Sequence, residues 1–445
     1  MISFQILHTR LRSITAGLLL LPSLALAAAT HQAPGKSNPE AVTATGNATE
    51  AAPLRIGSIT IRNLDVYSST EASRGWLYDI TDKLHIETRP SVISKFLLFR
   101  EGDEYRPERL AETERNLRAL HFLKSASVTT SEAHDGLVDV TVTTQDAWSV
   151  APETQAGSKG GTASFGANLS DTNFLGYGKE LDIGWDHNID RTSTAIDYQD
   201  PAFFAPYWNA RFTYGSNSDG YNHRVAVRRP FYAFSAPWSV DMSFNSMKQD
   251  DRIYARSVLF EKFRQNHRGM LLSFGRALTE RDDMANRIVA GLRHQRDDFT
   301  TLDGHEDARL PRSRDFRYAF VRLEHVENDF LKLNFVNKDM RFEDFNLGRQ
   351  ASVEAAVSPR KFGADSNSGF VRGAMARGFR LGETSFMTPS ISLESRLDGG
   401  VQNAILSSTV NLVRRFSVGG DHPSAFVGRA VMTNGWRVES ARSCT

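Results

Sequence analysis

Hydrophobic and polar residues alternate along most of the chain after about Gly160. Leu181, Ile183 and Trp185 alternate with Asp182, Gly184 and Asp186, and the segments 240–245 and 391–397 repeat the pattern. A period of two is that of a β-strand, whose successive side chains point to opposite faces. The pattern therefore predicts many strands that share one apolar and one polar face.

Such alternation occurs both in soluble β-sandwiches and in transmembrane β-barrels. Strands of soluble sheets average about five or six residues, whereas a tilted membrane strand needs roughly ten, and many of these segments are nearer the longer length. Aromatic residues also gather at segment ends, as the girdles of a membrane barrel require. They are Phe203, Phe204, Tyr207, Trp208, Phe231, Tyr232, Phe234 and Trp238. The sequence favours an antiparallel transmembrane barrel, with about twelve to fourteen strands present.

The segment 54–150 has a mixed pattern that predicts a separate small domain. A turn is expected at Gly102, and Leu110, Leu117 and Leu120 lie on one face of the helix that follows it. The predicted elements are a strand begun by Ile56, Ile59 and Ile61, a helix at 76–84, a helix from Pro107 to about Phe122, and strands at 126–130 and 137–144. This β-α-α-β-β order predicts an α+β domain with its helices on one face of the sheet.

The N-terminus has the order of a secretory signal. Arg10 and Arg12 precede the apolar run 14–21 and the small residues Ala25-Leu26-Ala27. No other segment is long and apolar enough for a spanning helix, so membrane insertion is expected through strands. The predicted organisation is a signal peptide at 1–27, a flexible linker at 28–53, the α+β domain at 54–150 and the barrel at 151–445.

Composition excludes several classes of function. The net charge of +1 offers no basic field for nucleic acid, and the single cysteine, Cys444, allows no intrachain disulfide. The polar stretch 303–307 contains Asp, His and Glu but has no second set of ligands, so we interpret it as a solvated loop. No nucleophile, phosphate-binding or metal motif is present. We therefore expect no enzyme activity, no cofactor and no bound metal.

Through two groups of residues the chain resembles the POTRA-plus-barrel proteins of the bacterial surface antigen type, which are relatives of the assembly factors BamA and TamA. In the α+β domain the resemblance rests on Gly102, Asp103, Tyr105, Leu117, Leu120 and Phe122. In the barrel it rests on Asn173, Leu175, Gly176 and Gly178, similar to the family's N-x-L-G-x-G strand entry, and on Tyr198, Asp200 and Pro201, similar to its Y-x-D-P strand end. The resemblance implies one POTRA domain and a barrel of sixteen strands.

The chain departs from the family pattern in two places. Arg377-Gly378-Phe379 matches the family's R-G-aromatic loop but lies within a predicted strand, so we interpret it as a chance match, and no such tripeptide follows Gly419-Gly420. The last residues, 439–445, lack the aromatic end of a closing strand. The barrel is therefore expected to be incomplete at its C-terminus, which leaves a non-functional truncated product as one alternative.

The resemblance implies a protein of the outer membrane, with its N-terminal domain in the periplasm, that assists insertion or translocation of other polypeptides. Its expected partners are outer-membrane lipid, an unfolded or secreted polypeptide client and a periplasmic or inner-membrane assembly partner. The alternatives are a passive pore or two-partner secretion transporter, and a soluble exported β-protein. Charges of the polar face are expected to line a hydrated lumen; they are Asp182, Asp186, Arg224, Arg228, Asp241, Glu394 and Arg396.

Overall fold

The computed structural model describes residues 53–66, 86–159, 162–255, 258–279, 281–302, 310–334, 336, 341–418 and 422–437. The expected signal peptide, linker and helix at 76–84 lie outside these residues, as do the stretch 303–307, Gly419-Gly420 and the last residues, 439–445. The described residues fall in one compact unit that begins at Ala52.

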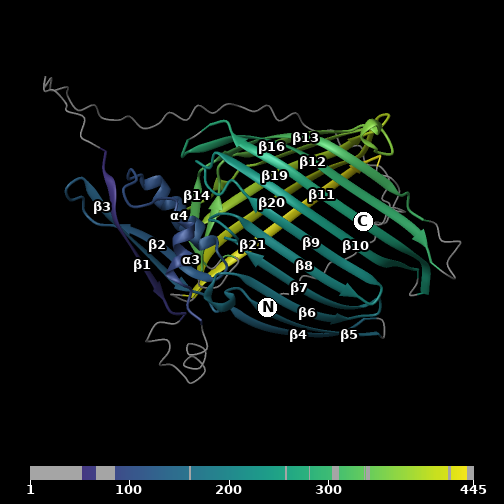
Figure 1. Cartoon of the computed structure of the whole chain (residues 1–445), viewed down its shortest axis with the longest axis horizontal. Coiled ribbons are helices and arrows are strands. Elements are labelled where there is room, and N and C mark those ends of the chain that lie inside the picture. The colour runs from purple at the N-terminus through teal and green to yellow at the C-terminus, as the bar shows by residue number, and fades with distance from the viewer. Residues whose placement is uncertain are drawn as a thin grey trace. The chain divides into compact units, whose positions relative to one another are not determined.

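The N-terminal domain contains a three-stranded sheet with helices beside it (Figure 1). Its elements are β1 (Arg55–Leu64), α3 (Pro90–Ile93), the 3-10 turn η1 (Ser94–Phe96), α4 (Pro107–Ala119), β2 (Leu123–Thr130) and β3 (Leu137–Asp146). The strand order is β1-β3-β2, with β1 parallel and β2 antiparallel to β3. Strand β1 and helix α4 lie where the sequence predicted them.

The period of two along β3 explains how this domain packs. Val138, Val140 and Val142 are all buried, while the residues between them are partly exposed. Val140 and Val142 belong to one core cluster with Leu117 of α4 and the ring of Phe122, which are 0% and 1% exposed. Burial of these apolar side chains is the main stabilising contribution to the domain.

The family-motif turn at Gly102 covers the start of β1. Gly102 has a φ of +85°, and its N–H donates to the carbonyl of Ile56 at 2.8 Å. The Asp103 carboxylate accepts the N–H of Arg100 at 2.9 Å, and the Tyr105 N–H donates to Leu54 O at 2.8 Å. The left-handed φ is one that glycine adopts without strain.

Most of the described residues after the N-terminal domain form one antiparallel sheet of 16 strands. Its strands are β4 (Val150–Lys159), β5 (Thr162–Asp171), β6 (Glu180–His187), β7 (Thr192–Asp200), β8 (Asn209–Asn217), β9 (Gly220–Arg229), β10 (Trp238–Ala255), β11 (Val258–Ala277), β12 (Met284–Thr301), β13 (Arg314–Glu327), β16 (Gln350–Ser358), β17 (Ser368–Ala376), β18 (Phe379–Arg380), β19 (Ser385–Leu397), β20 (Val401–Val418) and β21 (His422–Trp436). The predicted fold class, a small α+β domain followed by an antiparallel barrel-type sheet, is confirmed.

Two details of the sheet differ from the prediction. The expected count of twelve to fourteen strands is too low, because the path from β4 to β21 has fifteen strands in succession and the short β18 pairs beside it with β19. Arg377 and Gly378 lie between β17 and β18 rather than inside a strand, since Gly378 bends to donate its N–H to Leu347 O at 2.8 Å. Among the described ladders, β4 and β21 are the two ends of the path.

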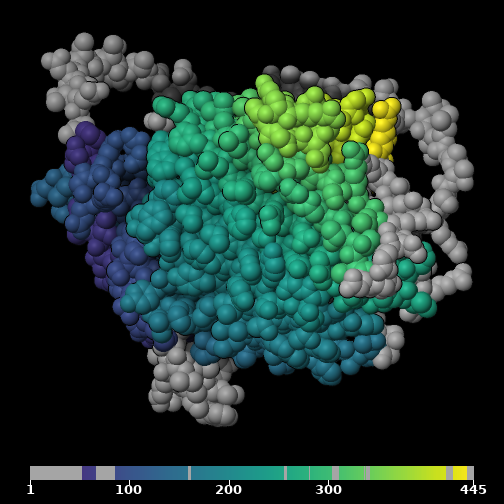
Figure 2. Space-filling view, turned by 45° about the vertical axis from the view of Figure 1, so that its right-hand side comes forward, coloured from purple at the N-terminus to yellow at the C-terminus, as the bar shows by residue number. Residues whose placement is uncertain are grey.

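We call the strand ends next to the N-terminal domain proximal and the opposite ends distal (Figure 1). The proximal connections include 172–179, 201–208, 230–237, 278–283 and 328–349, and the last of these contains a separate hairpin, β14 (Phe330–Asn334) with β15 (Phe342–Asn346). Figure 2 shows the N-terminal domain, in purple and blue, packed against the teal part of the sheet.

Candidate functional site

The N-x-L-G-x-G turn, residues 173–178, attaches the sheet to the N-terminal domain. Asn173 is 1% exposed; its side-chain amide donates to Ile86 O at 3.1 Å and to Thr88 Oγ1 at 3.0 Å. Its side-chain oxygen accepts the N–H of Gly178 at 2.8 Å. A buried amide with each of these groups hydrogen-bonded locks the turn against the domain.

The two glycines of this turn allow a close approach that other residues would prevent. Gly176 and Gly178 have φ angles of +74° and +64°. A Cβ on Gly176 would lie 2.5 Å from Glu87 O, and one on Gly178 would lie 2.6 Å from the Phe122 ring. Leu175, also left-handed at +57°, is half exposed. The motif residues therefore have a docking role here.

The Y-x-D-P strand end supports the next proximal turn. Asp200 is 3% exposed; it accepts the N–H of Ala202 at 2.9 Å and lies 3.3 Å from Lys179 Nζ. The Tyr198 hydroxyl reaches the same carboxylate at 3.5 Å, and Pro201 begins the turn. Ala202 packs in the hydrophobic core of the N-terminal domain, so this turn also joins the sheet to that domain. We call the contacts between the N-terminal domain and the proximal connections the junction.

Two of the aromatic residues at the proximal end contact each other at the junction. The rings of Tyr207 and Tyr232 stack with centroids 3.7 Å apart, and the Tyr207 hydroxyl donates to Leu97 O at 2.5 Å. Burial raises the pKa of Tyr207 well above its ordinary value, so it stays a neutral donor. Trp208 and Trp238 meet edge to face at 6.1 Å, as in an interfacial aromatic girdle.

Helix α4 holds the 230–237 turn with two polar side chains. The Glu112 carboxylate accepts the N–H of Phe234 at 2.9 Å, and the Asn116 amide donates to Tyr232 O at 2.9 Å. Glu112 is 6% exposed, and burial raises its pKa above the ordinary value. Neither residue was singled out in the sequence, because both occupy unremarkable polar positions of a helix.

The β14–β15 hairpin reaches the other side of α4. Arg118 Nε and Nη2 donate to the two oxygens of Asp344, each at 2.8 Å, with side-chain exposures of 5% and 11%. Glu114 pairs with Arg118 and with Lys332, the latter at 3.0 Å. Arg341 donates to the carbonyls at the end of α4, at 2.9 Å to Leu120 O and 3.3 Å to His121 O. A guanidinium there satisfies carbonyls that have no partner within the helix.

The sequence contained a weak signal for this hairpin that the analysis of motifs missed. The connection 328–349 is longer than the other proximal turns, and residues 331–333 alternate in polarity. Leu333 and Leu347 are buried with Phe386 and Val413 at the proximal ends of β19 and β20. A cavity of about 420 Å³ is lined by the hairpin, α4 and the 230–237 turn. The hairpin therefore joins α4 to the far side of the sheet.

We expect the two helix carboxylates to respond oppositely to pH. Burial by itself raises the pKa of Glu114, but Lys332, the Val128 N–H and Arg118 together hold it below its ordinary value. Its contribution to stability is thus present above the ordinary pKa and lost as the pH falls through the folded-state pKa. Ionised Glu112, whose pKa is raised, costs stability above that raised pKa. Glu114→Gln should therefore lower the thermal unfolding midpoint at pH 7, and Glu112→Gln should leave it unchanged or raise it.

Unfolding midpoints in detergent at pH 7 and pH 4 measure this difference. The deficit of Glu114→Gln should shrink at the lower pH, because wild-type Glu114 is then losing its charge as well. A deficit of equal size at both values would contradict the assigned ion pairs.

The charged residues of the polar face lie on one side of the strands, opposite the exposed Ile183, Trp185, Met242 and Phe244. Arg228 and Asp241 face each other across β9 and β10 and pair at 3.0 Å. The other predicted charges of this face each have a different neighbour. Asp186 accepts from Gln155, Asp182 is opposite Asp197, Arg224 is opposite Thr213, Glu394 lies 3.7 Å from Arg372, and Arg396 donates to Gln402 at 2.7 Å.

Glu354, a carboxylate of this face that forms three ion pairs, was not singled out from the sequence. Glu354 of β16 has a side chain 6% exposed and lies within 3.4 Å of three guanidinium groups. They belong to Arg293, Arg322 and Arg372, on three different strands. A network that joins several strands stiffens the polar face. A single exposed ion pair, by contrast, contributes little to stability.

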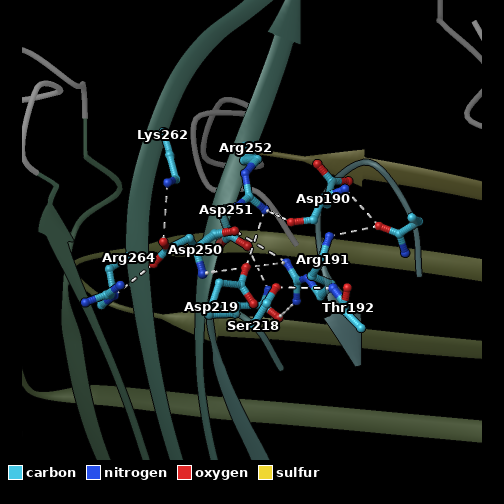
Figure 3. Close-up of polar contacts among 12 residues, drawn as sticks. Asp190, Arg191, Thr192, Ser218, Asp219, Asp250, Asp251, Arg252, Lys262 and Arg264 are labelled. Carbon is cyan, nitrogen blue, oxygen red and sulfur yellow. Dashed lines mark hydrogen bonds and ion pairs between the residues drawn. The ribbon is translucent and has the colours of Figure 1, made fainter. Parts of the chain in front are cut away.

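A second ionic cluster lies at the distal end (Figure 3). Arg191, in the turn after β6, donates to Gln249 Oε1 at 2.8 Å and lies 3.5 Å from Asp219, whose side chain is 5% exposed. Arg252 of β10 lies 3.4 Å from Asp219, and Tyr254 donates to Asp190 at 3.0 Å. These contacts hold the distal part of β10 against the β6–β7 and β8–β9 turns.

Within the described part of the chain, no helix is long and apolar enough to cross a membrane. The same residues contain no group of three or more His, Cys, Asp or Glu side chains suited to a metal ion.

Of the comparisons with known proteins, only the one with solved structures found similar chains. No protein-family model and no curated protein matches the chain. The chain is similar to BamA from Haemophilus ducreyi lacking POTRA domains 1–3, at 11% identity and a TM-score of 0.35, covering 85% of this chain and 72% of that one. It is similar to CdiB from Escherichia coli at 14% identity and a TM-score of 0.40, covering 89% and 86%, and to CdiB from Acinetobacter baumannii at 11% and 0.31, covering 86% and 74%.

Proposed function

We propose that this chain is exported, spans the outer membrane with its 16-stranded sheet, and assists insertion or translocation of other polypeptides there. The observation that carries the proposal is the junction. An α+β domain with an edge strand, β1, is held by buried polar contacts against one end of a sheet with an exposed apolar face. A protein that assists insertion of other chains needs a domain that binds the client and is fixed to the membrane sheet in this way.

The apolar face supports a membrane location. On neighbouring strands β10 to β16 it carries large apolar side chains that are two-fifths or more exposed; they are Met242, Phe244, Met270, Leu272, Phe274, Leu292, Val321, Leu323, Val353 and Val357. A contiguous apolar surface of this extent is unfavourable in water and favourable against lipid.

The mechanism we propose is backbone pairing, with no nucleotide, metal or enzymatic step. An extended client adds by β-augmentation to the β1 edge in the periplasm, at the later residues of β1 that the Gly102 turn does not cover. An edge strand offers N–H and C=O groups for such pairing. The end strands β4 and β21 offer further edges within the sheet. The N-terminal domain also provides the surface for a periplasmic or inner-membrane assembly partner. The polar face then lines a hydrated lumen.

A passive pore or two-partner secretion transporter is the second candidate. The charges of both signs on the polar face favour it, because they suit a hydrated channel wall. A pore predicts ion conductance that does not depend on the N-terminal domain.

Deleting 54–150 separates the two candidates. The full chain in phospholipid vesicles should accelerate folding of a urea-denatured outer-membrane barrel about tenfold or more, since edge templating replaces a slow unassisted strand pairing. The deletion should abolish this acceleration. A passive pore predicts instead that neither the full chain nor the deletion accelerates folding, while both conduct equally. Acceleration that survives the deletion would count against the assembly function.

A soluble exported β-protein is tested with the same preparations. The proposed membrane location predicts that the chain resists carbonate extraction and shows heat-modifiable mobility in a gel. Release into the soluble fraction would overturn it.

A further inference from the structure

The apolar face changes character abruptly towards the distal end of four adjacent strands. Across β10 to β13, the row Met242, Leu272, Leu292, Ala319 is wholly apolar. The next row towards the distal end is Phe244, Met270, His294, Arg317, and the one after it is Ser246, Arg268, Arg296, Asp315. Charge therefore begins directly where the apolar surface stops.

Seven cationic side chains of these strands lie on this face beyond the apolar rows. One of them, Arg252, pairs with Asp219 in the cluster of Figure 3, and we call the other six the distal basic patch. They are Lys248, Lys262, Arg264, Arg268, Arg296 and Arg317. Three carboxylates share the face. Asp250 pairs with Arg264 at 2.8 Å and with Lys262 at 3.5 Å, Asp298 with Arg296 at 2.7 Å, and Asp315 with Arg317 at 3.2 Å. Six cations against three carboxylates leave the patch positive.

Two of the cations have no partner among the described side chains. Arg268 is exposed and Lys248 half-buried, and no ion pair or side-chain hydrogen bond joins either to a described residue. Arg268 is also directly opposite Arg296 in the β11–β12 register. Like charges directly opposite each other on one face repel, so an anion bound between them relieves an existing strain.

The patch is confined to one sector of the sheet. Along β16, β17 and β19, and on the distal halves of β6 to β9, the same face carries no Lys or Arg. A general interfacial girdle would be spread around all strands. Asp250, which holds Lys262 and Arg264, also anchors the distal end of β10 through the cluster in Figure 3, so the patch has a fixed geometry.

We propose that the distal basic patch binds the phosphate groups of lipid headgroups on the side of the membrane away from the N-terminal domain. This inference rests on the proposed membrane location. Guanidinium groups match phosphate oxygens in a bidentate manner, and Lys and Arg next to an apolar belt are placed at headgroup depth. The lipid chains then pack on the apolar rows of the same four strands.

The test compares two matched double variants of the full chain. Arg268→Gln with Arg296→Gln neutralises the centre of the patch. Arg276→Gln with Arg414→Gln neutralises two exposed arginines at the proximal end of the same face. Each protein is reconstituted in phosphatidylcholine vesicles containing bisphosphorylated lipid A or its dephosphorylated form, released in detergent, and its retained lipid counted by native mass spectrometry.

Wild type and the proximal variant should retain the bisphosphorylated lipid equally, and the patch variant should retain about tenfold less. Retention of the dephosphorylated lipid should be weak for all three. Equal losses in both variants, or displacement of the lipid by inorganic phosphate at millimolar concentration, would overturn the proposal. Heat-modifiable mobility and carbonate resistance are recorded for each sample: their absence in wild type would refute the membrane location, whereas normal integration without a difference in lipid would refute the patch alone.

Discussion

Gly178→Ala is expected to destabilise the junction by about 2–4 kcal/mol. At a φ of +64° an added Cβ costs about 1 kcal/mol, and it would also lie 2.6 Å from the Phe122 ring, where overpacking costs about 1–3 kcal/mol more. Phe122 is 1% exposed and cannot move without disturbing the domain core. Thermal unfolding in detergent measures the loss, and hydrogen exchange of 86–92 and 120–124 locates it.

Gly136→Ala separates crowding from backbone strain. Gly136 has a similar φ of +75°, but nothing lies within 4 Å of its added Cβ. This variant should lose only about 1 kcal/mol and leave exchange at 86–92 unchanged. If Gly178→Ala behaved in the same way as Gly136→Ala, the close packing of the turn on Phe122 would be disproved.

Arg118→Ala is expected to cost about 3–5 kcal/mol, because it leaves Asp344 as an uncompensated charge that is only 11% exposed. Removing Asp344 should cost less, because Arg118 keeps Glu114 as a partner. The double variant Arg118→Met with Asp344→Leu should recover much of the loss of Arg118→Ala. We expect the hairpin 328–349 to become protease-sensitive in each single variant. Unfolding midpoints and limited proteolysis measure both effects.

Arg106 provides the control for this prediction. It pairs with Glu104 at 2.8 Å as well, but the two side chains are 42% and 51% exposed. Arg106→Ala should change the midpoint little, because solvent already screens the pair. A loss as large as that of Arg118→Ala would show that net charge, and not the buried pair, stabilises the junction.

The functional meaning of the junction follows from its location. The contacts of Asn173, Gly178, Glu112, Arg118 and Asp344 all join the N-terminal domain to proximal turns or to the hairpin. Under the proposed function, a client held at β1 would be kept beside the sheet by these contacts. If the proposed function is right, variants that loosen the junction should lower client folding while leaving membrane integration intact.

Periodicity in the sequence was enough to predict the elements. The alternation of Val138, Val140 and Val142 predicted β3, and Pro107 with Leu110 and Leu117 predicted α4, because burial of one face sets these periods locally. The strand count was too low, and one reason is the segment 150–159, which precedes the alternation expected from about Gly160 and alternates only weakly itself. Pairing with β5 nevertheless makes it a strand. Arg377-Gly378 shows the opposite error: the sequence placed these residues in a strand, but Gly378 turns to bond Leu347 O, a contact that is not local in the sequence.

The sequence by itself determined the two faces of the strands and the motif at 173–178, because each depends on residues close together in the chain; the export signal expected at 1–27 stays a prediction. Only the tertiary structure decided that Asn173 meets Thr88, that Arg118 meets Asp344, and that Arg268 faces Arg296. Those meetings depend on strand register and on which turns share one end of the sheet, and register is set by packing along the whole face rather than by neighbouring residues.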